Sequence, residues 1–135
     1  EIWLKLWANP TFNPMSALTH STLVDICQFP LTRQLAADMM TEAQSIANKL
    51  GVQFLIPLEK RIAGAEKVGK HKTSMLQDIE IGRAIEIDAL LGAVIELGQL
   101  TQTPTPHIDS VYACVKLLAK TLGEEKGKLK VEKIG

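Results

Sequence analysis

The chain has 135 residues, which suits one domain and is too short for two domains with separate cores. Hydrophobic residues make up 46% of it, which excludes an intrinsically disordered chain. Lys and Arg total 15, as do Asp and Glu, and this zero net charge argues against nucleic-acid binding. No apolar run reaches the roughly 20 residues of a membrane span, and no signal peptide opens the chain. Composition therefore predicts one cytoplasmic globular domain, with neither nucleic acid nor membrane as a partner.

Termini and cysteines add two expectations. The sequence begins with Glu1 rather than Met, so we expect a piece of a longer protein. Cys27 and Cys114 stand in apolar surroundings, which favours two unpaired core thiols in a reduced compartment. The three histidines lack the spacing of metal ligands, so no metal site is predicted.

Hydrophobic periodicity is helical almost throughout, with no convincing strand alternation, and predicts an all-α domain. A first helix is expected from Ile2 to about Asn13. Pro10 should bend or end it, because proline cannot donate to the carbonyl of Leu6. Asn13-Pro14 would then mark a break, with a short second helix running from Pro14 to about Thr19.

The clearest amphipathic helix is predicted for residues 32–50, where apolar residues recur at spacings of three and four. Gly51 follows where a left-handed cap belongs. A shorter helix should run from Pro57 to about Ala65, before an exposed, lysine-rich loop at residues 67–72.

Later helices have separate start signals. Ser74 and Gln77 have capping-box spacing, which predicts a helix from about Met75, with apolar periodicity continuing to Leu100. A last helix should follow Pro106 with one apolar side, comprising Ile108, Val111, Tyr112, Val115, Leu118 and Leu122. Residues 123–135 are lysine-rich and are expected to form an exposed tail.

Two groups of polar residues are candidates for chemistry. Lys5, Asn9 and Asn13 recur every four residues over about 12 Å of helix, as a solvated face or a binding face would. The second group interrupts an apolar stretch and fits either a charged helix face or a site: Ser74, Asp78, Arg83, Glu86 and Asp88. GxSxG does not occur, so no nucleophile elbow is predicted. GxGxxG does not occur either, so the chain cannot hold a dinucleotide alone by the usual βαβ device.

These groups resemble two signatures of the ketopantoate reductase (2-dehydropantoate 2-reductase) family. The first is Lys5-xxx-Asn9-xxx-Asn13-Pro14, and the second is the stretch Thr73-Ser74-Met75-Leu76-Gln77-Asp78, Gly82-Arg83, Glu86-Ile87-Asp88 and Gly92. The likeness runs from about Lys5 to Leu118. It implies a multi-helix C-terminal domain, similar to that of 6-phosphogluconate dehydrogenases, which follows an N-terminal Rossmann domain absent from this chain.

The resemblance also implies an activity: NADPH-dependent reduction of 2-dehydropantoate to (R)-pantoate, in pantothenate and coenzyme A biosynthesis. Lys5 would be the catalytic proton donor. Substrate-binding residues would be Asn9, Asn13 and Ser74, and Glu86 would contact the cofactor near its ribose. NADP would be bound mainly by the Rossmann domain, and the oligomeric state stays open between a monomer and a homodimer.

Geometry tests whether these residues can share one site. In a straight helix Ser74 and Glu86 would lie about 18 Å apart, too far for one small acid to touch both. We therefore predict a break near Gly82-Arg83, with a new helix starting close to Ala84 or Ile85.

Three positions depart from the family pattern. Leu23, Leu91 and the neighbourhood of His71 stand where many members have asparagine. These departures would suit a paralogue that acts on another 2-oxo acid. An inactive helical dimerisation or interaction module is the other alternative.

Overall fold

The computed structural model describes the backbone of residues 2–124 and the side chains of residues 9–124. Within that range the chain forms seven α-helices and one π-helical turn, without a β-strand. They are α1 (Ile2–Thr19), α2 (Leu23–Gln28), α3 (Pro30–Lys49), α4 (Leu58–Val68), α5 (Ser74–Glu80), η1 (Asp88–Gly92), α6 (Ala93–Leu100) and α7 (Pro106–Glu124). The predicted all-α class is confirmed.

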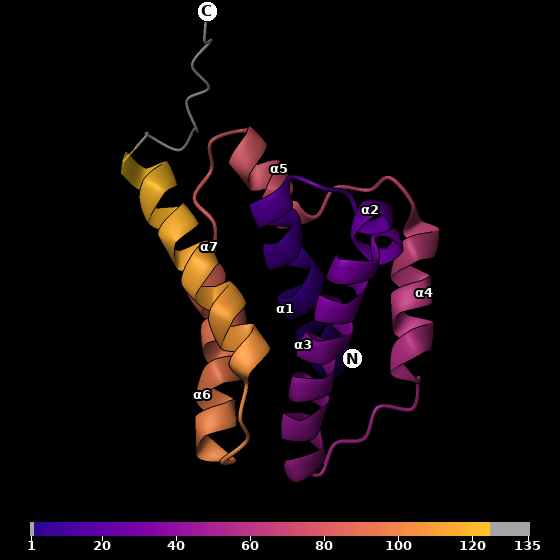
Figure 1. Ribbon diagram of the computed structural model, residues 1–135. Coiled ribbons are helices and arrows are strands. Elements are labelled where there is room, and N and C mark those ends of the chain that lie inside the picture. Colours follow the sequence, from indigo (N-terminus) through magenta and orange to yellow (C-terminus); the bar gives the residue numbers. More distant parts are fainter. Residues whose placement is uncertain (1, 125–135) are drawn as a thin grey trace, which may run out of the picture.

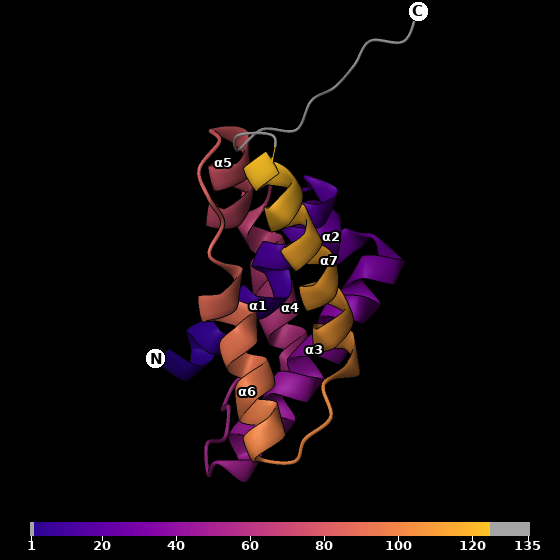
Figure 2. The ribbon, with the colours of Figure 1, turned by 90° about the vertical axis from the view of Figure 1, so that its left-hand side faces the viewer.

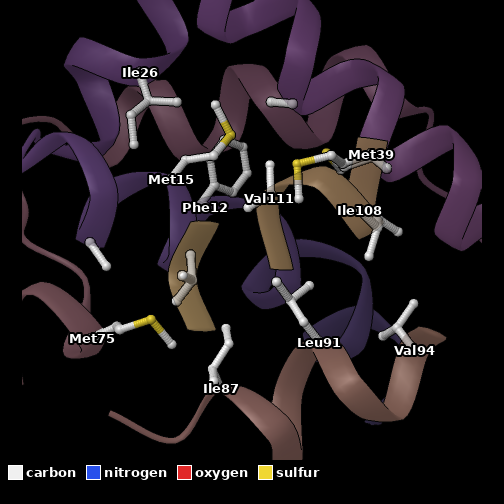
Figure 3. Packing of buried hydrophobic residues seen from close by; sticks show 14 of the residues in the cluster. Phe12, Met15, Ile26, Met39, Met75, Ile87, Leu91, Val94, Ile108 and Val111 are labelled. Carbon is white, nitrogen blue, oxygen red and sulfur yellow. The ribbon is translucent and has the colours of Figure 1, made fainter. Parts of the chain in front are cut away.

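Helices α1 and α3 organise the packing. Helix α1 contacts α3, α5 and α7, while α3 also contacts α2, α4 and α6. Figure 1 shows α6 and α7 along one side of this pair and α4 along the other, and Figure 2 shows the same arrangement after a quarter turn. Side chains from all of these layers meet in one core, in which Phe12 and Met15 of α1 gather with Met39 and Val111 (Figure 3).

Helix α1 runs unbroken from Ile2 to Thr19, so the predicted break at Asn13-Pro14 is wrong. Pro10 and Pro14 lie inside the helix and are both buried. An interior proline costs roughly 3 kcal/mol of helix stability. Tertiary packing offsets this, because the turns after Pro10 bury Phe12 and Met15, which are 4% and 3% exposed. Asn9 and Asn13 therefore belong to one continuous helix.

The predicted break after α5 is confirmed. Gly82 has φ +78°, its N–H donates to the carbonyl of Ile79 at 3.1 Å, and the N–H of Arg83 donates to the carbonyl of Asp78 at 2.7 Å. This pair of bonds is a Schellman motif. Residues 83–86 are then non-helical and helical structure resumes at Ile87, later than the predicted Ala84 or Ile85.

The start of α5 needs a correction of one residue. Thr73, not Ser74, is the N-cap, and its hydroxyl oxygen accepts from the N–H of Leu76 at 3.2 Å. Ser74 is therefore the first residue of the helix, and its hydroxyl does not serve as the cap.

Gly82→Ala should lower the free energy of unfolding by about 1–2 kcal/mol, because a left-handed φ crowds a Cβ against its own backbone. Gly64→Ala is the matched control. Gly64 lies inside α4 with open space around an added Cβ, so alanine there should stabilise by roughly 0.5–1 kcal/mol. Urea unfolding of the purified protein measures both. A change of the same sign in the two variants would contradict this reading of Gly82.

Most other boundaries fall close to expectation. Helix α3 starts at Pro30, and Gly51 has the expected left-handed φ of +83°. Helix α4 continues to Val68, so the expected loop starts only at Gly69. No local sequence pattern predicted α2 or the π-helical turn. Gly123 and Glu124 are exposed at the end of α7, and the rest of the predicted tail lies outside the described residues.

The two cysteines differ, which corrects the expectation of two core thiols. Cys27 is fully buried, whereas Cys114 is exposed at the edge of the apolar side of α7. Burial raises the pKa of the Cys27 thiol to about 11, so it stays protonated at neutral pH. Both thiols are free. Across the described helices, none combines the length and apolar character needed to cross a bilayer.

Candidate functional site

The hollow that residues of both signatures line, called the main hollow below, lies between α1 and α4 and has a volume of about 440 Å³. A hollow beside α2 is larger, at about 540 Å³, and no predicted site residue lines it. Helix α1 contributes Asn9, Phe12 and Asn13, at the i, i+3, i+4 spacing of one helix face. The segment before α5 also lines it, and that segment is held in place by backbone bonds from Leu23 to His71 and from Val24 to Gly69. The remaining lining residues are Leu23, Arg61, Gly64, Ala65, Val68, His71, Thr73 and Ser74.

A second hollow of about 260 Å³ adjoins the first. Asn13 and Ser74 line both, so they form the wall that the two share. Glu86 lines the second hollow together with Met75, Asp78, Ala89 and Leu90. The break after Gly82 thus brings Glu86 and Ser74 to the lining of one hollow; that they bind one ligand stays a prediction.

Several polar side chains that line the hollows have no hydrogen-bond or ion-pair partner among the described residues. Asn9 is exposed, Asn13 is half-buried and Ser74 is exposed; none of their side chains bonds to another residue within 9–124. The exposed carboxylate of Glu86 likewise makes no ion pair in that range. Donors and acceptors at this surface are thus arranged for a ligand rather than for each other.

The two hollows differ in the charge of the residues that line them. No Asp or Glu is among the described residues that line the main hollow, whereas its wall carries Arg61 and His71. The second hollow instead carries two carboxylates, Asp78 and Glu86. The main hollow suits an anionic group, and the second suits hydroxyl donors.

Two members of the second polar group do not line either hollow. Arg83 ion-pairs with Asp78 at 3.8 Å, across the end of α5. Asp88 accepts from the Tyr112 hydroxyl at 2.5 Å and from Lys116 at 2.9 Å, which ties the π-helical turn to α7. The pKa of Asp88 is lowered, mainly by the hydrogen bond from Tyr112 and next by the hydrogen bond from Lys116. These residues have structural roles.

Lys5 lies in α1, one turn before Asn9, and its side chain is outside the described set. Arg61 and Thr73 were not predicted as site residues, and both line the main hollow. Within the described part of the chain, no group of three His, Cys, Asp or Glu could hold a metal ion. The described residues thus define an all-α domain with an open hollow whose lining includes carboxamide and cationic side chains.

Comparison with known proteins narrows this class to a family. Residues 1–119 match the sequence model described as Ketopantoate reductase PanE/ApbA C terminal. The 2-dehydropantoate 2-reductase of Mesorhizobium japonicum is 58% identical over 91% of this chain, and that of Pyrococcus horikoshii is 31% identical over 84%. The crystal structure of 2-dehydropantoate 2-reductase from Methylococcus capsulatus covers 89% of this chain with a TM-score of 0.81 and 33% identity.

The chain therefore belongs to the C-terminal domain family of the ketopantoate reductases. It spans 38% of the length of both curated relatives, and 42% of the chain in the Methylococcus structure.

Proposed function

We propose that this chain is the substrate-binding and catalytic domain of an NADPH-dependent reductase that converts 2-dehydropantoate to (R)-pantoate in pantothenate and coenzyme A biosynthesis. The observation that supports this proposal is that Asn13 and Ser74 line both adjoining hollows and that Glu86 lines the second of them. Family membership supports the reaction. A Rossmann domain of the same protein would supply the facing wall, and the free thiols suit a cytoplasmic setting.

Each side chain has a task suited to its chemistry. Carboxamides donate and accept without adding charge, so Asn9 and Asn13 can fix the substrate carboxylate and hydroxyl in one orientation. The Ser74 hydroxyl adds a donor on the shared wall. Lys5 would give a proton to the C2 oxygen as negative charge develops there, which stabilises the transition state more than the ground state.

Glu86 is the residue of this chain that fits a nicotinamide cofactor. Its carboxylate is exposed at the second hollow without a described partner, and can accept from ribose hydroxyls. The cofactor supplies a hydride to C2 of the substrate. Asn13 and Ser74 would hold the carbonyl beside it, and the separation of charge between the hollows supports a substrate whose anionic end lies away from Glu86.

A paralogue that reduces another 2-oxo acid is the second candidate. Leu23 and His71 line the main hollow, and the family often has asparagine at or near these positions. Such replacements change the walls that contact a substrate and leave Asn9, Asn13 and Ser74 in place. The inactive dimerisation module has less support, because the residues of both signatures line the hollows together.

Purified complete gene product should oxidise NADPH when 2-dehydropantoate is added, and more slowly with NADH. Asn13→Ala should lower kcat/KM by about 10- to 100-fold, because one or two hydrogen bonds to a charged group are lost. Asn48→Ala is the matched control, since Asn48 is exposed on α3 and lines neither hollow. A preference for a different 2-oxo acid would favour the paralogue. Failure to reduce any 2-oxo acid would contradict both candidates.

A further inference from the structure

Arg61 is the arginine among the described residues that line the main hollow, and the proposed reaction gives it no role. It projects from α4 and lines the hollow, and its Nε is buried without a hydrogen-bond partner. No carboxylate in the described part of the chain lies within ion-pair distance of its guanidinium, although nearby Arg33 pairs with both Glu59 and Glu66. A buried donor without a partner is unfavourable in a folded protein unless something else satisfies it.

The surroundings of Arg61 leave room for a ligand. Arg61, Gly64, Ala65 and Val68 have the i, i+3, i+4, i+7 spacing of one helix face, and all four line the hollow. An added Cβ at Gly64 would meet nothing within 4 Å. The face of α4 that carries the guanidinium is thus built from a glycine, an alanine and a valine, which neither cover nor neutralise it.

We propose that Arg61 binds a carboxylate of the substrate and thereby determines specificity for acids; this rests on the proposed function. Among the other described polar residues that line the hollow, Asn9, Asn13, Thr73 and Ser74 are uncharged and His71 is charged only when protonated, so Arg61 supplies the permanent charge. A guanidinium matches a carboxylate with two parallel N–H donors. The carboxylate would bind the terminal Nη groups of Arg61, since no carboxylate of the described residues pairs with the guanidinium.

The test compares KM values of the complete gene product for a 2-oxo acid. Arg61→Ala should raise KM by about 10- to 100-fold with kcat changed less than about threefold, because the bond forms in ground and transition states alike. Arg61→Lys should recover part of the loss, since charge returns without the planar fork. Lys60→Ala is the matched control, because Lys60 is the exposed neighbour on α4. It should leave KM unchanged.

A neutral substrate separates charge recognition from a merely structural role. For the methyl ester of the same 2-oxo acid, Arg61→Ala should leave KM unchanged. Equal KM values for Arg61→Ala and wild type with every acid would overturn the proposal.

Direct binding keeps this inference distinct from the proposed reaction. Millimolar 2-oxobutanoate should raise the unfolding temperature of the wild-type protein and of Lys60→Ala, and should not raise that of Arg61→Ala. This holds even if NADPH is never oxidised, in which case only the reaction is wrong. Without ligand, Arg61→Ala should unfold at the wild-type temperature. Stabilisation of Arg61→Ala by the acid equal to that of wild type would contradict the inference.

Discussion

Lys5→Ala should lower kcat for 2-dehydropantoate reduction by about 100- to 10,000-fold, the usual contribution of a positioned general acid. Reduction of a carbonyl leaves negative charge on oxygen, and a group that both stabilises the charge and gives a proton acts only as that charge develops. Binding should change much less, because Asn9, Asn13 and Ser74 remain to hold the substrate. Steady-state kinetics of the complete gene product measures the split between kcat and KM.

Lys5→Arg separates proton donation from positive charge. Arginine keeps the charge but does not release a proton near neutral pH, so kcat should stay close to that of Lys5→Ala. The alkaline limb of the pH profile, which reports the acid, should disappear in both variants. Lys67→Ala is the control, because Lys67 is exposed on α4 and lines neither hollow. Retention of the alkaline limb in Lys5→Ala would assign the proton to another group.

Local signals in the sequence were sufficient to place most helices. Apolar spacing located α3 and α7. Proline before Ile108 marked the start of α7, and the glycine after Leu50 marked the end of α3. Helix α1 shows where such signals fail. Proline is a strong helix breaker in isolation, but Pro10 and Pro14 lie in a helix whose buried residues pack against α3, α5 and α7. That packing energy comes from helices that are distant in the sequence, so local patterns around the prolines do not predict it.

The candidate site likewise contains residues that the sequence predicted and one, Arg61, that it did not. Asn9, Asn13, Ser74 and Glu86 were predicted because they stand in two signatures that resemble a known family. The break near Gly82 was predicted because a straight helix would hold Ser74 and Glu86 about 18 Å apart. Arg61 stands in neither signature. Lys60 and Arg61 are consecutive cations in one charged helix, and only the direction of the helix face makes one exposed and the other a lining residue of the hollow.

Leu91 connects the core to the site. Its side chain is completely buried, near Ile87, Val94 and Ile108 (Figure 3). It belongs to the π-helical turn η1, whose Ala89 and Leu90 line the second hollow. An apolar side chain here suits an apolar core, and it fixes the turn that faces Glu86.

Leu91→Ala should therefore lower the free energy of unfolding by about 2–5 kcal/mol, through lost burial and the cavity left behind. Leu117→Ala is the matched control: the same substitution on α7, at a leucine that is 62% exposed, should change stability by less than about 0.5 kcal/mol. Denaturant unfolding of both purified variants measures the difference. If the loss of Leu91 loosens η1, KM for the cofactor should rise before the protein unfolds, because Glu86 lies two residues before that turn. Equal stability of the two variants would show that Leu91 does not anchor it.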